Sequence, residues 1–383
     1  MNFNYNKLLP QILTILAVIL VFGFFTYNAQ VNMDNRGIDF GFGFLSKESS
    51  FDVQFSLIEY DGSHSYFRAY LVGLLNTILV SVVGIILSTI IGIIVGIARL
   101  SPNYLTQKAA TFYVEFFRNI PLLLQLFFWY FAALRVLPLP EKAEPMLGVF
   151  FLTIKGFFVP AFIWNNLDIF IYSIIAAVIS IIFIRTYARK KQEIEGKQIP
   201  VLLISIGLLI ILPLLSFLIG GTSLSFEIPV LKQLAITSFT YEGGVGLPPE
   251  LIALTLALSL YTATFIAECV RAGVQGVGRG QKEAAASIGL TPNQVLKLVV
   301  MPQALRIIIP PTTNQYLNLT KNSSLAAAIA YPDLVLVFAG TALMQTGRAI
   351  EIVSITMLTY LSLSISISLL MNWYNKKIAI IEK

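Results

Sequence analysis

The sequence has little charge: aspartate, glutamate, lysine and arginine make up only 12% of its 383 residues. That is about half the share found in a typical soluble domain, so a water-exposed surface could not be built from this chain. Hydrophobic residues make up 56% of it. Apolar runs of about 20 residues recur along the chain, and each is long enough to cross a bilayer as one helix. The composition therefore predicts a membrane protein rather than two or three soluble domains.

The chain also lacks the residues of several kinds of chemistry. It has one cysteine, Cys269, and one histidine, His64, which excludes an internal disulfide and a metal cluster built from these residue types. No G-x-x-x-x-G-K-[ST] motif occurs, so the chain does not bind ATP as P-loop proteins do. A G-x-S-x-G motif is absent as well, and a single histidine does not favour a catalytic triad. We expect no enzymatic activity, no catalytic residues, no bound metal and no cofactor.

Eight segments are predicted to cross the membrane as helices, which gives an all-α, polytopic helical bundle. The first could instead be a signal peptide, but it is longer than the usual apolar core and no convincing cleavage site follows it. The seventh contains Pro310 and Pro311 and is polar, so it must face protein or a water-filled path. The predicted spans are residues 8–27, 70–98, 119–137, 169–187, 199–219, 249–269, 306–325 and 350–372.

Basic residues determine the expected orientation. The net charge of +6 comes from short segments between the apolar runs, rather than from the basic face or tail of a nucleic-acid-binding protein. With the N-terminus inside, 17 of the 26 basic residues fall in cytoplasmic segments, the C-terminal Lys376, Lys377 and Lys383 included. The positive-inside rule therefore predicts that both termini are cytoplasmic.

Five successive segments are expected along the chain. No internal repeat is visible, which weakens a reading as an inverted-repeat transporter. Residues 138–168 mix prolines with aromatic residues, so an interfacial or re-entrant loop is predicted there. The segments are 1–68 (first span and a periplasmic part), 69–137 (first part of the core), 138–247 (an inserted loop and two extra spans), 248–372 (the rest of the core with a long cytoplasmic loop) and 373–383 (a cytoplasmic tail).

The long loop between the sixth and seventh spans is predicted to form two short helices with a sharp corner. The stretch from Glu283 to Ile288 favours a helix, and Gly289 is the residue type that takes the left-handed conformation after a helix end. Thr291 then stands as N-cap, Pro292 at the first helical position, and Gln294 where it completes a capping box.

This corner has two possible roles. Ala284, Ala285 and Ala286 leave a shallow face on which a partner can dock, with Arg279 and Glu283 at its rim. The alternative is an ordinary capped connector between two spans. A connector of this length that is pinned at its corner and poor in bulky side chains favours docking.

The loop resembles a known motif. Glu283-Ala284-Ala285, with Gly289 six residues after the glutamate, is similar to the EAA loop of bacterial ABC-importer permeases. Val299 and Met301 replace the commoner isoleucine and leucine near its end, and both keep apolar bulk. The extra middle spans resemble the larger permeases of general L-amino acid importers. Stretches similar to the polar amino acid uptake branch, within residues 68–137 and 247–372, are Glu115–Gln125, Tyr261–Glu268, Arg271–Gly273, Gly280–Gln281, Pro302–Arg306 and Pro310–Pro311.

The resemblance implies the fold of a type I ABC importer permease in a bacterial inner membrane. It implies an ATP-driven importer of L-amino acids, polar or of broad range, with ATP hydrolysed by a separate ATPase subunit. Further implied partners are a periplasmic amino-acid-binding protein and a second permease, expected to be a different chain. In this family the EAA helix fits a groove on the ATPase. Residues 283–289, with Arg279 beside them, are therefore the implied coupling site.

Polar residues on two spans are candidates for the solute path. Tyr261, Thr264 and Glu268 share one face of the sixth span, because they are spaced by three and four. A charge at membrane depth costs about 2.5–3.5 kcal/mol, so such residues need partners or water. One hypothesis is that Glu268 and Lys321 face a shared cavity and recognise the amino and carboxyl groups of an amino acid. In the seventh span, one face carries Asn314, Asn318 and Lys321.

Alternatives stay open for these residues. Glu268 could lie at the cytoplasmic end near Arg271, and Lys321 could extend to the outer interface. Asn76 and Gln125 could line the path, or they could form interhelical hydrogen bonds. Small residues four apart in the second span, namely Gly84, Ser88, Gly92 and Gly96, permit close helix packing.

Two other functions remain to be weighed. An ion-coupled secondary transporter or a channel for small polar solutes would need no docked ATPase. A membrane scaffold without transport would not depend on Glu283 for solute uptake.

Overall fold

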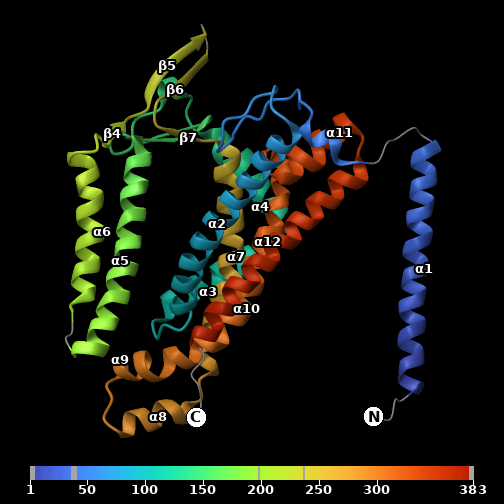
Figure 1. Cartoon of the computed structure of the whole chain (residues 1–383). Coiled ribbons are helices and arrows are strands. Elements are labelled where there is room, and N and C mark those ends of the chain that lie inside the picture. The colour runs from blue at the N-terminus through green and yellow to red at the C-terminus, as the bar shows by residue number, and fades with distance from the viewer. Residues whose placement is uncertain (1–4, 36–40, 197–198, 236–237, 379–383) are drawn as a thin grey trace. The chain divides into compact units, whose positions relative to one another are not determined.

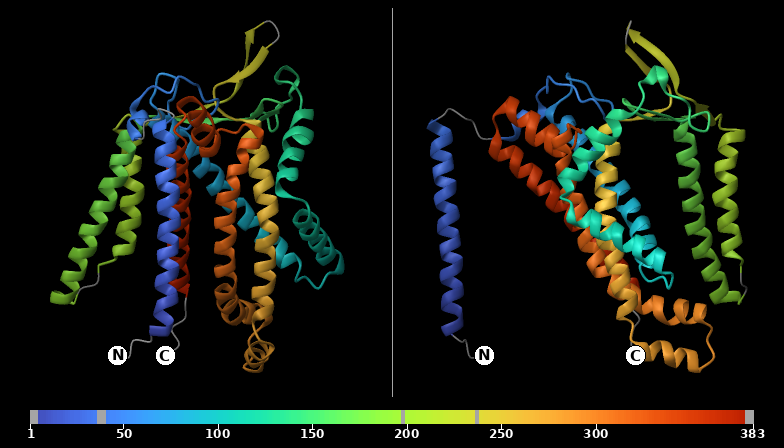
Figure 2. Two further views of the ribbon diagram at one scale, coloured as in Figure 1. Left: turned by 90° about the vertical axis from the view of Figure 1, so that its right-hand side faces the viewer. Right: turned by 180° about the vertical axis from the view of Figure 1, so that it is seen from behind.

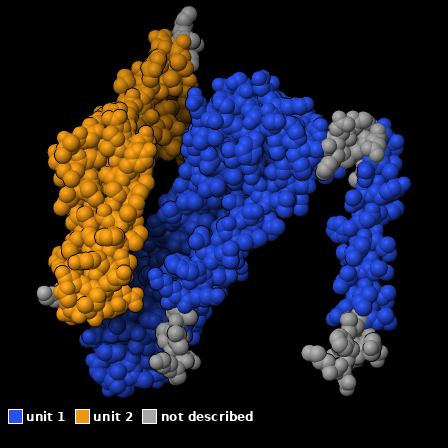
Figure 3. Space-filling view, in the orientation of Figure 1, with its two compact units in different colours: residues 1–132, 253–383 blue, residues 133–252 orange. Residues whose placement is uncertain are grey.

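The computed structural model describes residues 5–35, 41–196, 199–235 and 238–378. The chain divides into two compact units (Figure 3): unit 1 contains residues 1–132 and 253–383, and unit 2 contains residues 133–252.

Within the described residues, seven helices are long and apolar enough to cross a membrane, and eight if one bent pair is a single span. They coincide with the predicted spans, so the fold class of a polytopic helical bundle is confirmed. Helices α1, α2, α5, α7 and α12 extend beyond their predicted spans, whereas α6 lies within its predicted span of 199–219. The helices (Figures 1 and 2) are α1 Tyr5–Asn35, α2 Tyr66–Ala98, α5 Leu167–Glu195, α6 Val201–Leu218, α7 Pro249–Gly276, α10 Met301–Asn322 and α12 Ala349–Ile378.

The bent pair replaces the predicted third span. Helix α3, Tyr104–Asn119, is followed by α4, Leu122–Phe127, whose helical continuation reaches Val136, and the two parts meet at 101°. Ile120 and Pro121 lie at the bend in extended conformations, as expected for a proline and the residue before it. The amphipathic α3 was not predicted, since its mean hydropathy is too low for a span.

Glycine contacts bring α2 against α7 in unit 1. A Cβ atom added at Gly96 would lie 2.7 Å from Val270 Cβ, and one added at Gly92 would lie 2.7 Å from Ile266 Cβ. Gly84 instead faces the flexible end of Leu319 on α10, at 3.1 Å. The predicted role of this stripe in close helix packing is confirmed. Helices α10 and α12 also pack along each other.

A second group of contacts closes the end of unit 1 away from the EAA-like loop. The apolar cluster of Phe44, Tyr66, Leu334, Phe338 and Ile352 joins the segment before α2 to α12 and to the short helices between α10 and α12. The segment before α2 contains the 3-10 helix η1 Phe42–Ser46, and the short helices between α10 and α12 are the 3-10 helix η6 Ser323–Ile329, the π-helix η7 Val335–Ala342 and α11 Leu343–Thr346.

Unit 2 carries α5 and α6, which run antiparallel and side by side, with short antiparallel strands at one end (Figure 1). The loop predicted for 138–168 is wrong in part, because three strands form there. Two of them pair with residues 223–247, and such distant pairing cannot be seen in local composition. The strands are β1 Phe151–Thr153, β2 Gly156–Val159, β3 Ala161–Asn165, β4 Ser223–Glu227, β5 Val230–Ala235, β6 Ser238–Glu242 and β7 Val245–Leu247, in the orders β1-β2-β7, β3-β4 and β5-β6.

Asp333 is a fully buried carboxyl outside the spanning helices. Its Oδ1 accepts a hydrogen bond of 2.8 Å from the backbone N–H of Leu336 and so caps η7. Burial raises the pKa of Asp333 to about 7. This buried carboxyl was not predicted from the sequence.

We expect Gly96→Ala to destabilise the protein by about 1–3 kcal/mol, because the added methyl group meets backbone and a branched Cβ. Gly84→Ala is the matched control and should change stability less, since the end of Leu319 can move. Thermal unfolding of the detergent-purified chain measures both variants. Equal effects of the two changes would contradict this account of α2–α7 packing.

A pH dependence of stability is expected from Asp333. Its folded-state pKa lies above the ordinary value of 3.8, so its stabilising contribution is present below about pH 4 and is lost as pH rises through about 7. Asp333→Asn keeps an acceptor for Leu336 and should abolish the fall in melting temperature between about pH 5 and about pH 8. Asp61→Asn, at an exposed carboxyl whose pKa is lowered by hydrogen bonds from Ser63, should leave that fall unchanged.

Candidate functional site

The loop between α7 and α10 forms a rigid elbow, defined here as residues 279–300. Helix α8, Arg279–Ser287, ends before Gly289, which takes φ +87° as predicted. Gln294 Oε1 accepts hydrogen bonds of 2.9 Å from both the backbone N–H and the hydroxyl of Thr291. The predicted corner and its capping residues are confirmed.

The second arm of the elbow differs from the prediction of a short helix. Helix α9, Pro292–Gln294, passes into the π-helix η5, Val295–Val300, and the helical residues continue without a break into α10. The elbow is therefore one piece with the seventh predicted span, and a displacement of its second arm must act on α10.

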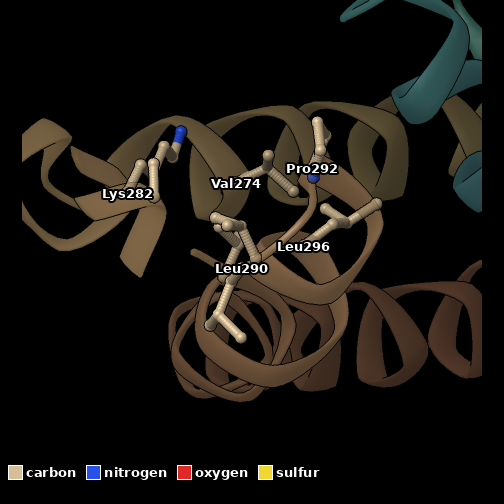
Figure 4. Close-up of a pocket in the computed structure, with 8 residues that line it drawn as sticks. Val274, Lys282, Leu290, Pro292 and Leu296 are labelled. Carbon is tan, nitrogen blue, oxygen red and sulfur yellow. The ribbon is translucent and has the colours of Figure 1, made fainter. Parts of the chain in front are cut away.

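A cavity of about 350 Å³ lies inside the elbow. Its walls are mostly apolar, and the labelled side chains around it come from α7, from α8 and from the second arm (Figure 4). Leu290 and Val295 both line it. The remaining lining residues are Val274, Lys282, Ala286, Pro292, Leu296 and Val300.

Most of the predicted coupling residues face outward. Arg279, Glu283, Ala284 and Gly289 are exposed, whereas Ala285 is buried and lies on the inner side of α8, which packs on η5. Ile288 was missed by the sequence analysis and is 78% exposed, a large apolar side chain beside the alanine face. Its place directly before the helix-ending Gly289 was the feature that could have identified it.

The base of the elbow, where it joins α7 and α10, packs against both of these helices. Val277 and Val300 join an apolar cluster with Ile266 of α7 and Ile308 of α10. A Cβ atom at Gly273 would lie 2.3 Å from Ile308 Cγ1, so α7 and α10 come as close here as a glycine allows. The elbow is therefore packed directly against both helices.

Glu268 lies in an ion cluster next to this base. Its carboxylate pairs with Arg99, the C-cap residue of α2, and with Arg271 one turn further along α7. Arg271 Nε lies 3.1 Å from Glu268 Oε1. This is the arrangement of the alternative interpretation, in which Glu268 lies near Arg271. Its role in solute binding stays a prediction, since both neighbouring charges are already engaged with it.

Other polar residues gather at a cavity of about 390 Å³ between α7 and α10. Three predicted path residues, Tyr261, Asn318 and Lys321, line it together. The sequence analysis missed Thr262, Phe265, Gln315 and Asn322, which line it too. Gln315 and Asn322 lie three residues before and four residues after Asn318, so helical spacing alone could have found them.

The remaining candidates lie elsewhere. Thr264 is buried and its hydroxyl donates to the Tyr261 carbonyl, while Asn314 is exposed but does not line this cavity. Asn76 Nδ2 donates to the carbonyls of Phe55 and Pro332, both at 2.9 Å. Gln125 Nε2 donates to the carbonyls of Phe117 and Ile120, which the end of α3 leaves free. Asn76 and Gln125 therefore have structural roles as hydrogen-bond donors to backbone carbonyls. A role in the solute path stays a prediction for both.

Comparison with known proteins agrees with this geometry. The family model described as "Binding-protein-dependent transport system inner membrane component" matches residues 197–380. The chain is 46% identical to the putative amino-acid ABC transporter permease protein YhdX of Escherichia coli (strain K12), over 97% of this chain and 94% of that protein. It is 47% identical to the general L-amino acid transport system permease protein AapQ of Rhizobium johnstonii, over 99% and 94%.

A third relative, the glutamate/glutamine/aspartate/asparagine transport system permease protein BztB of Rhodobacter capsulatus, is 40% identical over 99% of this chain and 95% of that protein. A bundle of spans with an EAA-like elbow and near full-length matches of this kind define a membrane-spanning transport component. The chain belongs to the ABC transporter permease family, and it is a multi-pass protein of the inner membrane. The family implies an ATPase and a binding protein as partners. The resemblance of the sequence to ABC-importer permeases is confirmed.

Proposed function

We propose that this chain carries polar L-amino acids across the inner membrane as one permease of an ATP-driven importer. The observation that carries the proposal is the 40–47% identity, over nearly full length, to permeases named for amino-acid transport. ATP hydrolysis belongs to the separate ATPase subunit, and a second, different permease completes the membrane part. Both termini are cytoplasmic, because that orientation places 17 of the 26 basic residues inside.

The elbow is the coupling site in this proposal. The exposed face of α8, with Glu283, Ala284 and Ile288, docks on the ATPase, and Arg279 lies at its rim. ATP binding moves the ATPase lobes, and the packed base of the elbow passes that motion to α7 and α10. ATP and solute each shift the equilibrium between inward-open and outward-open forms only by their differential affinity for the two forms.

The cavity between α7 and α10 is the proposed solute site. The exposed ammonium of Lys321 is placed to bind the carboxylate of an amino acid, since a charge-assisted hydrogen bond is stronger than a neutral one. Amide oxygens of Gln315, Asn318 and Asn322 are acceptors for its amino group. Glu268, paired with Arg99 and Arg271, is proposed to hold α2 to α7 below this site.

Reconstitution separates this proposal from an ion-coupled transporter or channel. In vesicles that hold the complete importer, uptake of radiolabelled amino acids should require ATP and the binding protein. Uptake by this chain without an ATPase, driven by an ion gradient, would favour the alternative function.

Glu283→Arg is expected to lower both ATPase co-purification and ATP-driven uptake by about tenfold or more, because it places a bulky cation on the docking face. Glu193→Arg makes the same charge change on an exposed turn of α5 and serves as the control. Wild-type uptake with Glu283→Arg would instead support a scaffold whose elbow does not couple to ATP.

Lys321→Met should reduce uptake by about tenfold or more, since losing a hydrogen bond to a charged group costs about 1.5–3 kcal/mol. Asn314→Ala changes the same helix face outside the cavity lining and should keep uptake near wild type. Normal uptake by Lys321→Met in an intact complex would remove the lysine from the solute site.

A further inference from the structure

A basic cavity lies in unit 2, between the end of α5 and the start of α6, and it plays no part in the proposed transport path. Its volume is about 680 Å³. Polar and charged side chains line one part, and aliphatic side chains line the other. The lining residues are Arg185, Arg189, Gln192 and Ser205, with Ile181, Ala188, Ile199, Val201 and Leu202.

The length of the helices places this cavity at the membrane interface. Asn166 Nδ2 donates to the Gly221 carbonyl at 3.1 Å, so the start of α5 lies level with the end of α6. From Leu167 to Arg185, α5 rises by about 27 Å, close to the hydrocarbon thickness of about 30 Å. Helix α6 rises by about 26 Å over its 18 residues. Arg185 is therefore near the start of α6, at the depth of lipid headgroups.

Within the described residues, the charge of the two cavity arginines is only partly neutralised. No hydrogen bond or ion pair of the Arg185 side chain occurs within the described part of the chain. Arg189 pairs with Glu193 at 3.2 Å, but the two side chains are 84% and 64% exposed, so water screens that pair. Residues 185–195 hold four basic and two acidic side chains, a net charge of +2.

The membrane orientation of the chain does not by itself explain a cavity lined by two arginines. The positive-inside rule requires basic residues near the ends of spans, but it does not require a cavity between two helices. Ala188 is buried, so the small side chain lets α5 and α6 meet, while Arg185, about one turn before it, and Arg189, the next residue, border the same space. Spacing of four residues puts both guanidinium groups on one face of α5.

We propose that this basic cavity binds the headgroup of one anionic phospholipid. The phosphodiester lies between the guanidinium groups of Arg185 and Arg189, which bind phosphate oxygens in bidentate fashion. Gln192 offers an amide donor, and the acyl chains descend along Ile181 and Leu202. In the orientation proposed above, the cavity faces the cytoplasmic leaflet, where anionic lipids are found and where basic pockets between helices bind their headgroups.

Lipid retention by the purified full-length chain tests this proposal. Native mass spectrometry would follow protein equilibrated in detergent with phosphatidylglycerol or, separately, with phosphatidylcholine. The wild type should retain one phosphatidylglycerol in preference to phosphatidylcholine. The double variant Arg185→Gln/Arg189→Gln should lose that population by about fivefold or more, the factor expected for removing about one interfacial charge interaction.

The matched control is Lys190→Gln/Lys191→Gln, which removes the same charge from the same turns of α5. Neither lysine lines the cavity, and Lys191 Nζ lies 5.7 Å from the centre of the Tyr187 ring. This variant should retain phosphatidylglycerol within about twofold of wild type. Unchanged elution in size-exclusion chromatography shows that each variant is folded.

Three results would overturn the proposal. Equal loss of lipid from both double variants would mean diffuse attraction to the membrane rather than a site. Displacement of the lipid by excess inorganic phosphate would mean a site for a free anion. Absence of the lipid from the complete importer, with crosslinks from the cavity to another subunit, would mean that a protein occupies it.

Discussion

Close contact between α7 and its neighbours is the constraint on which the rest of unit 1 depends. Gly92 and Gly96 of α2 leave no room for a methyl group against Ile266 and Val270, and Gly273 leaves none against Ile308. Lipid tails are as apolar as leucine, so apolar burial does not hold membrane helices together. Tight packing at small residues does so instead. An ion pair between Arg99 and Glu268 joins α2 and α7 at the same end of their contact.

The same helices carry both halves of the proposed mechanism. The elbow continues α10 without a break, and its apolar base packs on α7, while the polar cavity with Lys321 lies between these two helices further along. In the proposed mechanism, a displacement of α8 at Glu283 reaches the proposed solute site through α7 and α10.

The packing of unit 2 differs from that of unit 1. Its two long helices meet through small residues such as Ala177 and Ala188, and most of their other side chains are exposed as lipid-facing surface. At the strand end, Tyr241 packs on Phe151 and Phe158, and its hydroxyl donates to the Pro140 carbonyl. At the other end, Arg185 and Arg189 line the basic cavity that we propose as a lipid site.

Local sequence determined the spans, the elbow and its capping, because apolar length, the left-handed glycine and the Thr291–Gln294 pair act over a few residues. Helical spacing, a local property, also put Tyr261, Asn318 and Lys321 among the candidates, and these three line one cavity, whereas Thr264, Glu268 and Asn314 do not line it. Only the tertiary structure decided that Glu268 meets Arg99, that Asp333 is buried, and that strands form between residues 151 and 247. Those outcomes depend on partners that are distant in the sequence, or on which surfaces meet, and no local pattern encodes them.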